Sequence, residues 1–143
     1  MQENTDNDIL LAYLRGKEIE TIDGDTWQRV TELADQHGVS ELLYHRLSKQ
    51  ADTFPTVRLY ELHKKYLLSA ARNSYFFHEL SKILAILHEE LIPVIVLKGA
   101  FLAERIYENI SARPMGDIDL LVHENDLGKV DNLLVKLEFR RMF

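Results

Sequence analysis

The chain has 143 residues, a length that suits one domain, or one domain with part of a second. Its net charge of −6 gives no basic field for nucleic acid, and 46% apolar residues are enough for a packed core. With no cysteine, disulfides and thiolate zinc sites are excluded. No apolar run reaches the ~20 residues that span a bilayer, and the acidic N-terminus is unlike a signal peptide. We therefore expect a cytoplasmic protein with no membrane partner and no indicated nucleic-acid partner.

The first part of the chain contains three short amphipathic segments, each with a helix-start signal. The predicted caps are Asn7 or Asp8 for the first helix and Asp25 or Thr26 for the second, and Ser40 with Glu41 is expected to start the third. The glycines expected to end the first two helices are Gly16 and Gly38.

A long helical pattern follows. Pro55 stands where a first-turn proline belongs, and from there to Glu90 the chain has no further proline or glycine. Apolar residues recur at helical spacing, so we predict one helix of up to ~50 Å, or two helices with a bend near Asn73 and Ser74. The aromatic residues in this pattern are expected to pack against other helices rather than stack on bases.

The composition changes near residue 92, from all-helical to mixed. A β-branched apolar run over 94–97 predicts a strand that breaks at Lys98 and Gly99. An amphipathic segment over 101–107 predicts a helix, and a polar loop containing Arg113 leads to a second apolar run. A last helix is expected to begin at Asn125 or Asp126.

Two carboxylates begin the second predicted strand. Successive strand residues point to opposite faces, so Asp117 and Asp119 share one face while Ile118 and Leu120 point into the core. Like charges side by side are costly unless a cation lies between them. Since Mg²⁺ takes carboxylate oxygens together with substrate phosphates, this strand predicts a metal-binding pair.

The expected fold class is α+β, with a helical region over 1–90 and a small, partial sheet with flanking helices over 91–143. A sheet of two strands is marginal by itself. Either the long helices cover it or the natural domain continues past residue 143, and we favour the second interpretation.

The sequence LKGAFLAERIY followed by RPMGDIDLLV resembles the uncharacterised nucleotidyltransferase family of bacterial proteins, within the DNA polymerase β-like superfamily. In that superfamily a strand ends in a hydrophobic-Gly-Gly/Ser turn, a helix follows, and the next strand carries Asp-x-Asp. Here Leu97, Gly99 and Ala100 match the turn, with one lysine inserted. Asp117 and Asp119 match the carboxylate pair, and the resemblance covers roughly the last third of the chain.

The resemblance implies an enzyme that transfers a nucleotidyl group from an NTP to an unknown acceptor and releases pyrophosphate. Asp117 and Asp119 would be the catalytic residues and would hold two Mg²⁺ ions. The acceptor hydroxyl or similar group, the base of the NTP, and a homo-oligomeric or other protein partner are not specified by the motif.

The same resemblance assigns nucleotide binding to the turn and the loop. Gly99 would let the backbone approach the phosphates, with amides of the following helix, including that of Ala100, pointing at them. Lys98 and Arg113 are candidate phosphate neutralisers. The alternatives are that Lys98 is simply exposed and that Arg113 pairs with one of the two aspartates as a structural brace.

A third carboxylate, which the superfamily carries on a further strand, is not evident, as in a member truncated after the Asp-x-Asp strand. The acids after that strand fall in or beside the last predicted helix; they are Glu124, Asp126, Asp131 and Glu138. One alternative is therefore a catalytically incomplete, antitoxin-like interaction module. Another is a helical structural protein with an incidental Asp-x-Asp, which predicts that Gly99 lies far from Asp117.

Overall fold

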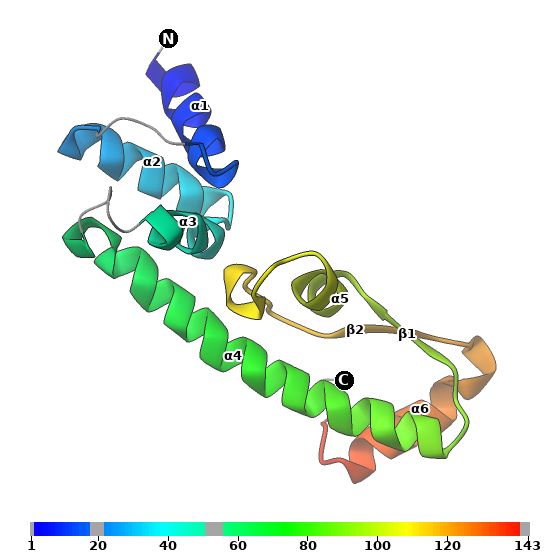
Figure 1. Ribbon diagram of the computed structural model, residues 1–143. Helices are drawn as coiled ribbons and strands as arrows, with labels where there is room; N and C mark the ends of the chain where they lie inside the picture. Colours follow the sequence, from blue (N-terminus) through cyan, green and yellow to red (C-terminus); the bar gives the residue numbers. More distant parts are fainter. Residues whose placement is uncertain (1, 18–21, 51–55, 141–143) are drawn as a thin grey trace.

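The computed structural model describes residues 2–17, 22–50 and 56–140, and its fold class is α+β, as predicted (Figure 1). The helices and strands are α1 Gln2–Leu14, α2 Gly24–Gln36, α3 Ser40–Leu47, α4 Thr56–Glu89, β1 Val94–Leu97, α5 Lys98–Arg105, β2 Asp119–Val122 and α6 Leu127–Lys136. Three short 3₁₀ helices connect them: η1 Ser48–Gln50, η2 Ile110–Ala112 and η3 Glu124–Asp126. None of the described helices combines the length and the apolar character needed to cross a membrane.

Helices α1 to α3 pack together on the N-terminal part of α4 and form a first core (Figure 1). Helix α1 begins earlier than predicted, so Asn7 and Asp8 lie inside it and not at its start. Its polar first part is held by Asp6, which is buried and accepts a hydrogen bond from Arg29 Nε of α2 at 2.8 Å. This contact between helices is not visible in local sequence, which explains the error.

Helix α2 is capped by Asp23, so the prediction of Asp25 or Thr26 was wrong. Asp23 Oδ1 accepts from the backbone N–H of Thr26 at 2.9 Å, and Oδ2 accepts from the Thr26 hydroxyl at 2.7 Å. The helix therefore begins with Gly24, a residue that the sequence reading placed outside it. The predicted start of α3 at Ser40 is confirmed.

Helix α4 runs unbroken for 34 residues, so the predicted single long helix is confirmed and the alternative with a bend near Asn73 and Ser74 is not observed. The expected role of Pro55 lies outside the described residues. Phe76 and Phe77 pack on a core cluster, as expected of aromatic residues on this helix. Tyr60 and Tyr75 do not, because 58% and 61% of their surfaces are exposed.

The two strands pair antiparallel, with Val94 opposite Val122 and Leu97 opposite Asp119. One face of this sheet packs on the C-terminal half of α4, where α5 and α6 complete two further clusters (Figure 1). On the other face Ile95 lies directly opposite Leu121, and both side chains are more than half exposed. Within the described residues no third strand joins the sheet.

Candidate functional site

The antiparallel register places the turn after β1 beside the start of β2. Leu97, the last residue of β1, pairs with Asp119, the first residue of β2. Lys98 follows directly, and its Nζ lies 3.2 Å from Asp119 Oδ2. Two segments separated by about twenty residues of sequence thus meet as a cation and a carboxylate at one end of the sheet.

The two aspartates are accessible from solvent. Asp117 lies two residues before β2 and is exposed, while Asp119 is partly buried. Ile118 and Leu120 pack into the core cluster beneath the sheet, as the alternation predicts. The side that carries the carboxylates is therefore the side away from α4.

The backbone strain of the turn falls on Lys98, not on the glycine. Lys98 has φ of 45°, in the left-handed region that lysine rarely adopts. Gly99 has no positive φ, and a Cβ added to it would meet Met115 Cγ at an ordinary 3.6 Å. Since Met115 is two residues before Asp117, the separation of Gly99 from Asp117 that an incidental motif predicts is not observed.

Helix α5 begins at this turn without a side-chain cap, because its N-cap residue, Leu97, has no polar side chain. The first N–H groups of a helix have no acceptor inside it, and they carry the positive end of its dipole. Ala100 lies in this first turn, but its side chain is buried in a cluster with Leu80, Ala103 and Met115. What Ala100 can offer a ligand is its backbone N–H.

The structure does not bring Arg113 to the two aspartates. Its guanidinium carbon lies 5.6 Å from the centre of the Tyr107 ring, and no ion pair joins it to a carboxylate among the described residues. Its Nε is buried and lacks a hydrogen-bond partner in the described part of the chain. The alternative in which Arg113 braces Asp117 or Asp119 is therefore wrong.

Sequence reasoning missed Asn73, which holds the loop between α5 and β2. Its side chain is fully buried, and Nδ2 donates to the carbonyl of Ile110 at 2.5 Å and to that of Arg113 at 2.7 Å. A polar residue at a core-facing position of a long helix is the signal that could have found it. Asn73 thereby fixes the segment that leads to Asp117.

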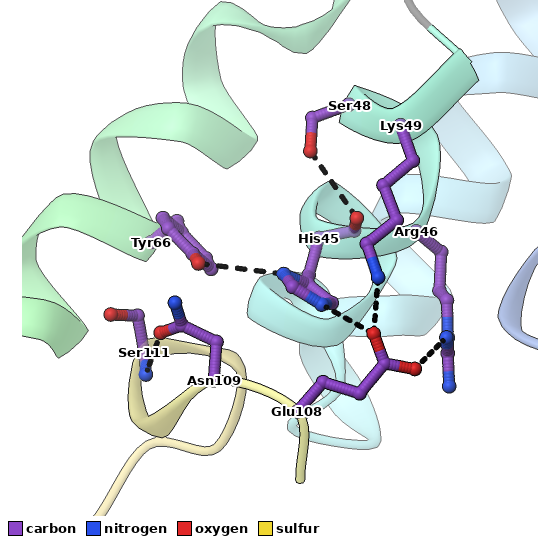
Figure 2. A network of polar contacts seen from close by, with 8 residues as sticks. All are labelled: His45, Arg46, Ser48, Lys49, Tyr66, Glu108, Asn109 and Ser111. Atoms are coloured by element: carbon purple, nitrogen blue, oxygen red, sulfur yellow. Dashed lines mark hydrogen bonds and ion pairs between the residues drawn. The ribbon is translucent and has the colours of Figure 1, made fainter.

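A second missed group is the network around Glu108, just after α5 (Figure 2). Its carboxylate contacts Arg46 Nη1 at 2.8 Å, His45 Nε2 at 3.4 Å and the ammonium of Lys49. Hydrogen bonds to this carboxylate, foremost from Lys49, then from Arg46 and His45, lower the pKa of Glu108 from 4.5 to about 2. The network holds the start of the loop between α5 and β2 against α3 and η1.

The carboxylate pair has no third acidic partner in the described residues, where no group of three His, Cys, Asp or Glu side chains is placed to hold a metal. The later acids lie where the sequence placed them, in η3 and α6 or just beyond; Glu124, Asp126, Asp131 and Glu138 are these residues. His123 also has a structural role, because its Nδ1 accepts from the backbone N–H of Asn125 at 3.2 Å.

In this structure β1 ends at a turn that opens α5, and β2 begins at Asp119, two residues after Asp117. A family model described as uncharacterised nucleotidyltransferase matches residues 23–142. The chain belongs to this family, and the match extends beyond the last third of the chain to α2, α3 and α4. Neither the curated proteins nor the solved structures contain a match.

Proposed function

We propose that this protein binds Mg²⁺ and an NTP at Asp117 and Asp119 and transfers a nucleotidyl group to an acceptor. The observation that carries the proposal is the pairing of Leu97 with Asp119, which sets the first turn of α5 beside the carboxylates. In the proposed reaction an acceptor oxygen forms a bond to the α-phosphorus of the NTP. The bond from that phosphorus to the pyrophosphate breaks, and the proton of the acceptor passes to solvent.

The residues present fit a magnesium ion. Asp117 and Asp119 supply hard oxygen donors on an accessible face, and Mg²⁺ commonly takes one or two carboxylates, several waters and the phosphates of its substrate. Held by Asp117 and Asp119, Mg²⁺ would neutralise triphosphate charge and favour in-line displacement, and the family resemblance implies two such ions.

The residues around the pair suit a triphosphate. The uncapped amides at the start of α5, including those of Gly99 and Ala100, can donate to phosphate oxygens. Lys98 already lies against a carboxylate on an exposed arm, so it can exchange that partner for a phosphate. Arg113 remains a candidate phosphate neutraliser, although it lies over Tyr107 and not against the aspartates.

A second candidate function is that of a module that binds a nucleotide or a partner without catalysing a reaction. The specific observation in its favour is that the described residues offer the carboxylate pair without a third acidic partner. Binding and turnover must therefore be measured separately.

Titration calorimetry of each NTP, with and without Mg²⁺, tests the binding step. We expect Mg²⁺-dependent binding to the wild type and its loss in Asp117→Asn/Asp119→Asn, because the amides cannot replace two charged ligands. Glu124→Gln/Asp126→Asn is the matched control: it removes the same charge from the segment after the same strand. Binding by the control and not by the site variant supports the site.

Two other outcomes separate the alternatives. Binding that is equal in wild type and Asp117→Asn/Asp119→Asn would contradict the site. Mg²⁺-dependent binding without pyrophosphate release, tested over candidate acceptors, favours the module without turnover.

A further inference from the structure

Helix α4 carries a row of exposed apolar side chains along its N-terminal and middle turns, which we name the α4 stripe. Its large members are between 53% and 88% exposed; they are Val57, Tyr60, Leu67, Leu68 and Tyr75. Ala71 is exposed between them. At 100° per residue these positions fall within an arc of about 100° on one side of the helix.

Most of the stripe lies on a side of α4 that the rest of the described chain leaves open, while Tyr75 at its end also lines a cavity with Leu120 of β2 and Leu134 of α6. Helices α1 to α3 and the sheet lie along the opposite side of α4 over this length (Figure 1). The stripe is about 27 Å long at 1.5 Å per residue. Its large side chains together expose roughly 600 Å², a patch of the size that marks protein interfaces rather than scattered surface residues.

We infer that the α4 stripe binds the same stripe of a second copy, with the two helices antiparallel. A twofold interface requires one patch to complement itself. The stripe can do so if the twofold axis passes midway between Leu67 and Leu68. In an antiparallel pair about that point, Leu67 faces the partner copy's Leu68 and Tyr60 faces the partner copy's Tyr75.

Outside these pairs, Val57 at the end of the stripe faces the partner copy's His78, and the polar Lys64 lies within the arc of the stripe. Lys64 faces the partner copy's Ala71, whose small side chain leaves room for the lysine stem. The Lys64 ammonium is already neutralised by Glu61 Oε1 at 2.8 Å and lies 4.5 Å from the centre of the Tyr60 ring. No unpaired charge is therefore placed in the middle of the interface.

The expected area lies at the lower limit for a specific dimer. Two stripes would bury about 1,200 Å², the lower limit of stable protein interfaces and more than most crystal-packing contacts.

Sedimentation velocity over a range of concentrations tests the association. We expect a monomer–dimer equilibrium that Leu68→Lys weakens at least tenfold, because each dimer loses two buried leucines. Val135→Lys is the matched control, since Val135 is an exposed apolar residue on a different helix, α6. We expect this control to dimerise like the wild type.

Cysteine cross-linking tests the direction, and the absence of native cysteine makes the background clean. In the antiparallel pair, Lys64→Cys/Ala71→Cys forms covalent dimers on oxidation, while each single variant does not. The two positions of one helix are about 10 Å apart, too far for a disulfide within one chain.

Three outcomes would overturn the inference. The first is a wild-type protein that remains monomeric at every concentration, which would show that the stripe does not bind a second copy. The second is a dimer that Leu68→Lys and Val135→Lys affect equally. The third is cross-linking by the single variants, which indicates parallel helices. None of these results depends on nucleotide binding, so the test is separate from that of the proposed function.

Discussion

Asn73 joins the middle of the longest helix to the loop that precedes the Asp-x-Asp pair. Its two hydrogen bonds go to backbone carbonyls 37 and 40 residues further along the chain. One helical turn earlier, Ser69 is also buried, but its hydroxyl has no partner among the described residues. Asn73 Oδ1 likewise has no partner among the described residues, so Asn73 differs from Ser69 in the two hydrogen bonds that its Nδ2 donates.

We expect Asn73→Ala to lower the free energy of unfolding by about 2–4 kcal/mol, because two buried carbonyls lose their donor. Ser69→Ala is the matched control and should be neutral or stabilising by up to about 1 kcal/mol, since it removes an unsatisfied hydroxyl. Urea denaturation of both variants measures the difference. Equal destabilisation would mean that packing, and not hydrogen bonding, is what these positions supply.

Glu108 should make stability depend on pH at the acidic end. Its folded pKa of about 2 is below the ordinary 4.5, so the ionised form stabilises the fold. This stabilisation is complete above pH 4.5 and is lost as the pH falls towards 2. The free energies of unfolding of wild type and Glu108→Gln should therefore differ at neutral pH and converge near pH 2.

The same comparison in high salt should show a smaller difference, because the network is exposed to solvent and is screened. Glu104→Gln, which removes an exposed carboxylate of α5 outside the Glu108 network, is the control. A difference between wild type and Glu108→Gln that persists at pH 2 would show that the charge of Glu108 is not its source.

At the scale of elements, four helices end in the same way. After each of them one residue has a positive φ, and paired backbone hydrogen bonds of the Schellman type close the turn. The residues with positive φ are Gly16, Gly38, Leu91 and Glu138. Glycine occupies two of these positions, so α1 and α2 end without strain while α4 and α6 do not.

Leu91→Gly should therefore stabilise the protein by about 0.5–1 kcal/mol, since glycine relieves the left-handed conformation. Little packing is lost, because 86% of Leu91 is exposed. Ala85→Gly, an exposed interior position of the same helix, should instead destabilise by about 1 kcal/mol. Thermal melts that place both variants on the same side of the wild type would contradict this account.

These endings show which elements the sequence could predict. The ends of α1 and α2 were predicted because Gly16 and Gly38 are local signals, and β1 was predicted by its β-branched run. The cap of α2 was missed because Asp23 is followed by a glycine that reads as a loop. The start of α1 depends on the ion pair of Asp6 with Arg29, 23 residues away.

In the candidate site too, features set by local sequence were predicted and features set by distant contacts were not. The alternation of Ile118 and Leu120 with the two aspartates is local, so the outward face of the carboxylates followed from the sequence. The contacts of Asn73 and Glu108 join residues 37 to 63 positions apart and repeat at no period. Only the folded chain reveals them.

At the scale of the whole molecule, α4 belongs to every core cluster. Leu59 and Leu62 lie in the first core with α1, α2 and α3, while Ile83 and Leu87 lie under the sheet with α6. The Glu108 network adds a second link, from α3 to the loop after α5 (Figure 2). A disturbance in one core should therefore reach the other.

We expect Leu87→Ala to destabilise the entire chain by about 2–5 kcal/mol, because Leu87 is fully buried. Trp27, the single tryptophan, lies in the first core and reports on the other end of the molecule. Its fluorescence and the far-ultraviolet dichroism should show one shared midpoint, lowered in the variant. A Trp27 transition that the substitution leaves unmoved would show that the cores unfold independently.

The exposed cross-strand pair of Ile95 and Leu121 should make aggregation of the protein depend on pH. At pH 7 the net charge of −6 keeps molecules apart, so a small adhesive patch on the sheet is tolerated. Near the isoelectric point of about 5.5 that repulsion vanishes. Turbidity should then be greatest close to pH 5.5 and should decrease in Leu121→Lys, whose added charge sits on the patch itself.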